Sequence, residues 1–318
     1  MSGTDNTLCG EVRTCLLPTR HAVNGEVAEV LLRLRPDERV SLSQRPNLYA
    51  VSPDILTGVD CRLPTANMAR VRAVGTVATR AVLTEGRVLQ ATACFRVAPR
   101  GQDRRGPWGY YLVRPGVVVP LGRLPQRELT QGFLRGHQPG ELDVGSIAEG
   151  LLAHICRQDD LLDQDRPLAA PGTRLRFAAA PGPDGEPARL VRFTLAEQGV
   201  RTVELRVPQG TEPRAVAGLC EDLALHDWLL TTVVNKLDGI QLGSMERTAA
   251  LKVLRPLVDH LLHLWMPGAR VDRSLTAPWE ALEEDPGFTR QWQTQVQRIR
   301  DQLALQAVLL QSNALAAS

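Results

Sequence analysis

The stretch from Leu219 to Asn235, LCEDLALHDWLLTTVVN, decides how the chain is organised. Its apolar residues recur at spacings near three and four, which predicts a helix that buries a broad stripe against a core. The same pattern extends this helix over about residues 214–238. Strand patterns dominate before it and helical patterns follow it, so we expect the helix to join the two halves of the chain.

The composition is that of an ordinary globular protein. Of the 318 residues, 43% are hydrophobic and 23% are charged, which argues against global disorder and against a fibrous fold. This length suits one large domain or, as we expect here, two. The net charge of +2 gives no whole-molecule attraction to nucleic acid or to a membrane surface.

The distribution of cysteines and apolar residues predicts a cytoplasmic protein. Six cysteines are scattered without a Cys-x-x-Cys motif and without a preceding signal peptide, a pattern typical of reduced thiols. No apolar run approaches the roughly 18 to 20 residues that a membrane-spanning helix needs. We therefore expect no membrane span.

Residues 1–165 are predicted to form an N-terminal α+β domain. Its central feature is a hairpin over residues 70–98, with a turn at Thr84–Arg87 and small or apolar residues on both faces. Such a hairpin suits the middle of a sheet that is covered on each side. A second tight hairpin is expected from Tyr110–Val113 and Val117–Leu121, on either side of Pro115 and Gly116.

Residues 166–318 are predicted to form the second part of the chain. Three strand patterns joined by turn-rich segments favour an antiparallel meander over residues 173–207. A helical region over residues 212–313 follows, in which the helix near residues 245–266 is expected to be the most buried. The predicted fold class is therefore α+β, with mixed or antiparallel sheets in the N-terminal two thirds and a helical bundle at the C-terminus.

His226 and Asp222 are the first residues to weigh as a catalytic pair. They are four positions apart, so they are neighbours on a helix, and a carboxylate beside an imidazole can increase its basicity. The alternative is that both side chains fix helix packing. The packing role is favoured because neither a nucleophile nor a metal partner accompanies the pair, so no residue is assigned a catalytic role.

His260 and His263 have the i,i+3 spacing of helix-borne metal ligands. Two ligands are too few for a zinc or iron site, and the sequence proposes no third. A phosphate-binding glycine-rich loop followed by lysine is absent, as is the Gly-x-Ser-x-Gly motif of serine hydrolases. We therefore predict no metal and no cofactor.

The loop from Arg100 to Trp108 is the strongest recognition element in the sequence. Arg100, Arg104 and Arg105 could hold phosphates or the carboxylates of a partner, and Trp108 could stack on a base or anchor an interface. The alternative is a solvated loop whose tryptophan folds back onto the sheet.

The last predicted helix, near residues 287–312, is unusually rich in glutamine. An uncharged polar surface loses less on desolvation than one made of lysine and glutamate, so it could lie against another subunit. We assign Gln291, Gln295 and Gln302 to this partner-binding surface. Exposed glutamines on a terminal helix also need no such role.

Four groups of residues together resemble an uncharacterised actinobacterial, Streptomyces-type protein family. The resemblance covers most of the chain. Its members are encoded beside a variant P-loop protein and a predicted methyltransferase, which implies a multi-component system but no activity. The segments that carry it are Gly10–Leu17, residues 49–53 with 56–61, Val71–Ala81 and Cys220–Thr232.

The sequence therefore favours a non-enzymatic cytoplasmic component of a multi-protein system. It would bind protein partners, among them products of neighbouring genes, or assemble into a homo-oligomer through its C-terminal helices. One alternative is an enzyme, a hydrolase or a nucleotide-dependent transferase, that uses His226 with Asp222 or His260 with His263. Another is nucleic-acid binding by the Arg100–Trp108 loop, which is not favoured.

Overall fold

The structure, a computed structural model, describes residues 7–67, 71–98, 101–195, 199–238 and 247–316. The strands are β1 (Leu8–Leu16), β2 (Ser41–Ser43), β3 (Tyr49–Val51), β4 (Ile55–Leu63), β5 (Val71–Thr84), β6 (Val88–Val97), β7 (Val117–Pro120), β8 (Thr173–Pro181), β9 (Arg189–Leu195) and β10 (Val200–Val207). The α-helices are α1 (Gly25–Leu32), α2 (Trp108–Leu112), α3 (Gln126–Arg135), α4 (Val144–Cys156), α5 (Pro213–Asp238), α6 (Arg247–His260), α7 (Ala277–Glu284) and α8 (Phe288–Ala316).

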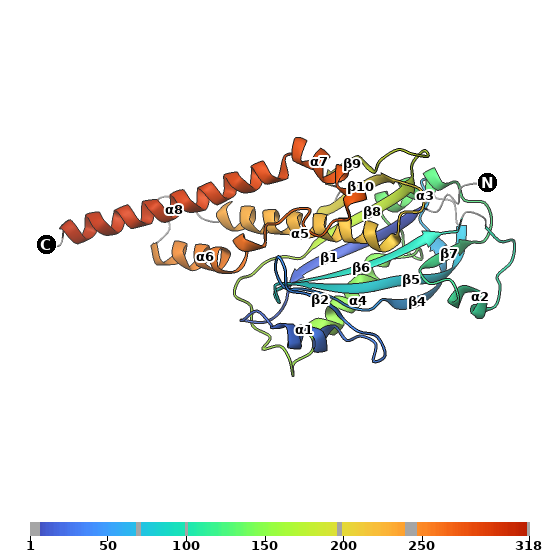
Figure 1. The fold of residues 1–318 in the computed structure, drawn as a ribbon, viewed down its shortest axis with the longest axis horizontal. Helices are drawn as coiled ribbons and strands as arrows, with labels where there is room; N and C mark the ends of the chain where they lie inside the picture. Colours follow the sequence, from blue (N-terminus) through green and yellow to red (C-terminus); the bar gives the residue numbers. More distant parts are fainter. Residues whose placement is uncertain (1–6, 68–70, 99–100, 196–198, 239–246, 317–318) are drawn as a thin grey trace.

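One mixed sheet forms the body of the described chain (Figure 1). Nine of its ten strands run in the order β2-β3-β5-β7-β6-β1-β8-β10-β9, and the tenth, β4, pairs with β5. The β5–β6 hairpin turns at Glu85 and Gly86, which both have positive φ, as a tight hairpin turn requires. With the helices at the C-terminus, this arrangement confirms the predicted α+β class.

The sheet is continuous across residue 165. β1 pairs with β6 on one side and with β8 on the other, both antiparallel, so strands from the two predicted domains are neighbours. Side chains of β1 alternate between two cores. Leu8, Val12 and Leu16 face α5 and the C-terminal helices, whereas Cys9 lies in a second core with α1, α3 and α4 on the opposite face.

The predicted antiparallel meander over residues 173–207 is wrong. β10 lies beside β8 and parallel to it, and β9 pairs antiparallel with β10 at the edge of the sheet. Burial explains the order. β10 carries the fully buried Val203 and Leu205, which suit an interior strand, whereas β9 is exposed at most of its positions and suits an edge.

The predicted second hairpin is also wrong in its first half. Residues 108–112 form α2, in which Tyr111 is fully buried and contacts Tyr110 edge to face. β7 instead inserts between the ends of β5 and β6, antiparallel to the first and parallel to the second. The aromatic contacts fix the helical turn, and the short Tyr-Leu-Val pattern did not reveal them.

The C-terminal helices pack on the sheet through α5. Its Trp228 is fully buried and donates from Nε1 to the carbonyl oxygen of Pro171 at 3.0 Å. The expectation that the helix near residues 245–266 is the most buried is wrong, because α6 packs beside α5 and α8 and exposes Leu251 and Val258. α8 reaches well past the ends of α5 and α6 (Figure 1).

Candidate functional site

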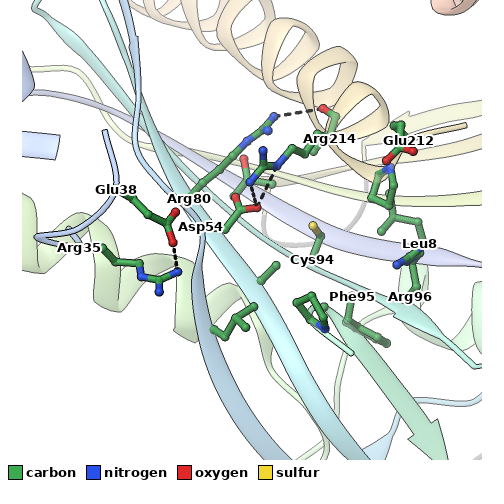
Figure 2. A pocket seen from close by; sticks show the side chains of 17 residues that line it. Leu8, Arg35, Glu38, Asp54, Arg80, Cys94, Phe95, Arg96, Glu212 and Arg214 are labelled. Atoms are coloured by element: carbon green, nitrogen blue, oxygen red, sulfur yellow. Dashed lines mark hydrogen bonds and ion pairs between the residues drawn. The ribbon is translucent and has the colours of Figure 1, made fainter. Parts of the chain in front are cut away.

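A pocket of about 460 Å³ opens where α5 begins. Because α5 starts only at Pro213, the sheet in front of its first turn is left without a covering helix. The floor is formed by small and polar side chains of the sheet, and Figure 2 shows these residues with the start of α5 beside them. The floor residues used below are Leu8, Ala78, Arg80, Thr92, Cys94 and Arg96.

A buried ion pair closes the inner end of this pocket. Arg80 donates from Nε and Nη2 to the two carboxylate oxygens of Glu221 at 2.8 and 2.7 Å, and Thr92 donates to the same carboxylate at 2.6 Å. Burial by itself would lower the pKa of Arg80. The charge of Glu221 and its hydrogen bonds outweigh that cost and raise this pKa, so Arg80 stays cationic.

Charges of both signs line the rim of the pocket. Arg214 donates from Nε and Nη2 to Asp54 at 3.0 and 2.7 Å, and Arg35 pairs with Glu38 (Figure 2). The side chain of Arg96, by contrast, forms no ion pair or hydrogen bond with any described residue.

The pocket has the character of a binding site. Burial raises the pKa of the Cys94 thiol to about 12, so this group is protonated at neutral pH and is a weak nucleophile. None of the described residues that line the pocket is a histidine. The lining offers contacts and charges of both signs, among them the carboxylates of Glu38, Asp54 and Glu212.

His226 and Asp222 lie in the interior beneath the segment that follows α6. Nδ1 of His226 donates to the carbonyl oxygen of Asp222 at 2.7 Å, and Nε2 accepts from the N–H of Met266 at 3.2 Å. A carboxylate oxygen of Asp222 accepts from the N–H of Gly268 at 2.8 Å. Both ring nitrogens of His226 are therefore hydrogen-bonded. Together His226 and Asp222 hold the loop that contains Met266 and Gly268 against α5.

The aromatic surroundings keep this pair away from solvent. The His226 ring contacts Trp265 and Trp279 edge to face, and the adjoining cavity measures only about 20 Å³. Burial lowers the pKa of His226, with Asp222 offsetting part of the effect, and burial raises the pKa of Asp222. The structure gives a substrate no access to this imidazole.

His260 and His263 come near one another at the end of α6. Partial burial lowers the pKa of His260, and the charge of Arg87 adds to this effect. Among the described residues, no group of three or more histidine, cysteine, aspartate or glutamate side chains is placed to hold a metal ion. The structure thus supplies no third ligand for the pair.

The arginine loop is only partly free to bind a partner. Arg100 lies outside the described residues, and Arg104 is exposed. Arg105 donates to Asp60 at 3.0 Å and its guanidinium lies 5.1 Å from the ring centre of Trp108. Asp60 also accepts two hydrogen bonds from Arg72, which lower the pKa of this carboxyl.

Trp108 folds back onto the protein. Its ring packs edge to face on Tyr111 and lies against the backbone of Gly58 on β4. Trp108 remains 38% exposed. This geometry corresponds to the solvated loop that the sequence offered as the alternative to a recognition element.

The predicted glutamine surface lies along the docked half of α8. Gln291 donates to the carbonyl oxygen of Pro286 at 3.1 Å, and Gln295 accepts from Arg298 at 2.8 Å, so both amides bond to nearby parts of the chain. Gln302 is half-buried where α8 leaves the body. Beyond it, Leu305 and Val308 are exposed at 46% and 60%.

Sequence reasoning missed the pocket, because its residues come from seven separate stretches of the chain. One signal was present. Arg80 and Arg96 are long charged residues within strands of a hairpin predicted to be covered on both faces, which is a reason to look for a partner or an opening.

Comparisons with known proteins add no relative. No protein-family model matches the chain, and searches of curated proteins and of solved structures gave no match. The described helices include none that is both long and apolar enough to cross a membrane.

Proposed function

We propose that this protein is a non-enzymatic component that binds protein partners, and first of all a second copy of itself, through the end of α8. The observation that carries the proposal is the exposure of Leu305 and Val308 on a helix that leaves the body of the molecule. These residues are three apart, so they lie on the same side of the helix.

The two halves of α8 differ in what they contact. The first half packs into the core through Phe288, Trp292 and Ile299, and Trp292 stacks on Trp265 with ring centres 4.4 Å apart. From Ala304 to Ala316 the helix continues for about 20 Å. In proteins most of the stability of a helix comes from the packing of its apolar face. A partner would supply that packing.

The composition of this end favours a second copy as the occupant. From Gln302 to Ser318 the sequence has no charged residue. A twofold symmetric contact places the same surface on both sides, so any charge near the axis would meet its own copy. An uncharged helix of leucine, alanine, valine and glutamine avoids this repulsion, whereas it offers no charge pattern to select a different partner.

The neighbouring helix adds apolar surface at the same end of the molecule. Leu251 and Val258 of α6 are each 38% exposed, and their spacing of seven residues places them on one face of that helix. α6 contacts α8, so the two helices could contribute to one interface. The enzyme alternative has weaker support, because His226 is enclosed and His260 with His263 gain no further ligand from the residues that the structure describes.

The test is the oligomeric state of the full chain, measured by light scattering after size-exclusion chromatography and by mass photometry over a wide range of concentration. The wild-type protein should form dimers as the concentration rises. The double variant Leu305→Glu, Val308→Glu should weaken association by about a hundredfold or more, because burying each apolar side chain is worth about 1.5–3 kcal/mol.

Val113→Glu is the matched control. Val113 is an apolar residue exposed at 75%, and it follows α2 at the opposite end of the molecule, so this charge should leave association unchanged. A wild-type protein that stays monomeric at every concentration would overturn the proposal. So would a double variant that associates as strongly as the wild type.

A further inference from the structure

The charged side chains in and beside the pocket in front of α5 differ in whether they form ion pairs. Asp54 and Glu38 on its rim are each paired with an arginine, and Glu221 is paired with Arg80. Arg96 has no such partner among the described residues. It projects from β6 on the same face as Cys94, two positions earlier, and both side chains line the pocket.

Arg80 adds a second donor to the same space. Its Nε and Nη2 bond to Glu221, and Nη2 also donates to the carbonyl oxygen of Arg214, but Nη1 makes no hydrogen bond with the described residues. The first turn of α5 lies beside this group, and a helix N-terminus favours negative charge. Three features of one pocket thus favour an anion.

The remaining lining limits what that anion can be. Leu8, Ala78, Cys94 and Ala217 form an apolar surface, which suits the body of an organic molecule better than a free inorganic ion. The exposed carboxylate of Glu212 also lines the pocket, so a doubly charged group would meet more repulsion than a singly charged one. The volume, about 460 Å³, falls within the roughly 300–1,000 Å³ range of small-molecule sites.

We infer that this pocket binds a small organic monocarboxylate, whose apolar body lies over Ala78 and Cys94 and whose carboxylate pairs with Arg96. This site is separate from the end of α8, so it neither requires nor excludes self-association.

Three probes of the same shape test the charge requirement on the full-length protein. They are phenylacetate, 2-phenylethanol and 2-phenylethylamine, which are an anion, a neutral molecule and a cation. Binding is followed by saturation-transfer NMR and by titration of amide resonances. Phenylacetate should bind at least about tenfold more tightly than the other two, since a hydrogen bond to a charged group is worth about 1.5–3 kcal/mol.

Two variants locate the binding. Arg96→Gln should reduce the affinity for phenylacetate to that of 2-phenylethanol, and Ala78→Phe should fill the floor and reduce binding of all three probes. Arg189→Gln, on the exposed edge strand β9, is the control and should bind phenylacetate as the wild type does. Circular dichroism and thermal unfolding confirm that each variant is folded.

Several results would overturn the inference. These are equal affinities for the three probes, a lack of binding by phenylacetate, or an Arg96→Gln variant that retains the wild-type affinity. Arg96→Lys keeps the positive charge and should retain part of the preference for the anion. If that variant behaves as Arg96→Gln does while folded, the carboxylate requires the two-pronged geometry of arginine, and the inference stands in that narrower form.

Discussion

Two glutamates are buried on opposite faces of the same sheet, and their charges are neutralised in different ways. Glu11 on β1 is completely buried beneath α4 and contacts three arginines. Glu221 on α5 is also buried, but it has a single arginine, Arg80, together with the hydroxyl of Thr92. The first site is closed on all sides, whereas the second adjoins the pocket in front of α5.

The arginines around Glu11 come from two strands. Arg176 donates to one carboxylate oxygen at 3.1 and 2.9 Å, and Arg174 donates to the other at 3.3 Å. Arg13 pairs with Glu11 at 2.8 Å and with Glu149 of α4 at 3.3 Å. Gly145 lets α4 approach, since a Cβ there would lie 2.5 Å from the carboxylate.

In these two sites the burial of the anion is linked to whether a ligand can reach its cationic partners. Three cations surround one buried anion, so the α4 face has its electrostatic partners inside the protein. On the α5 face, one cation is shared between a buried anion and an open pocket. Arg80 can therefore still donate a hydrogen bond to a ligand in the pocket on the α5 face.

The largest effect is expected from Glu11→Gln. Removing this charge leaves Arg176, which is itself buried, without a counter-ion, and breaking a buried pair typically costs about 3–5 kcal/mol. Urea unfolding should show a loss of free energy of unfolding in that range. Glu149→Gln is the control, because Glu149 is mostly exposed and its loss should cost less than about 1 kcal/mol. Equal losses from the two variants would contradict this reading of the site.

A smaller effect is expected from Glu221→Gln. Arg80 would lose its counter-ion too, but water in the pocket can solvate the freed guanidinium, so the loss should be about 1–3 kcal/mol. The same unfolding experiment measures it. A loss as large as that of Glu11→Gln would mean that the neighbouring pocket gives Arg80 no relief, and the contrast between the two faces would fail.

The smallest effect concerns the pH dependence of stability on the α5 face. Burial lowers the pKa of His226, so below about pH 6.5 the unfolded chain binds a proton there that the folded protein does not. Stability should therefore fall as the pH drops from 7 toward 5, by at most about 1.4 kcal/mol per pH unit from this residue.

The variant His226→Gln isolates this contribution. It should have a flatter pH profile between pH 7 and 5 than the wild type, measured by urea unfolding at each pH. The raised pKa of Asp222 acts with the opposite sign at lower pH, where the folded protein keeps a proton that the unfolded chain has lost. An unchanged slope in the variant would assign the pH dependence to other groups.

Sequence patterns predicted the helices and strands better than they predicted which strands pair with one another. The turn at Glu85 and Gly86 and the long helix α5 are local features, fixed by backbone conformation and by helical periodicity. The position of β10 between β8 and β9 was not predicted, because strand pairing depends on which side chains the whole protein can bury.

The pocket was beyond sequence reasoning for the same reason. Arg80 and Arg96 lie in one hairpin, but Arg214 is far from them in the chain, and no local pattern indicates that the three line one pocket. His226 and Asp222 were proposed together because they are close in sequence. Their actual partners, the backbone of Met266 and Gly268, come from a loop that the helical spacing does not indicate.

The sequence by itself determined the α+β class, the amphipathic stripe of α5 and the uncharged end of α8, since each follows from composition and periodicity along a continuous stretch. Only the tertiary structure decided which charged side chains have all their partners inside the protein and which remain accessible to a ligand. Glu11 and Glu221 are both acidic residues within apolar segments of the sequence. Their difference arises from where α4 and α5 begin on the sheet, because a helix start decides which part of a face is covered and which part stays accessible to a ligand.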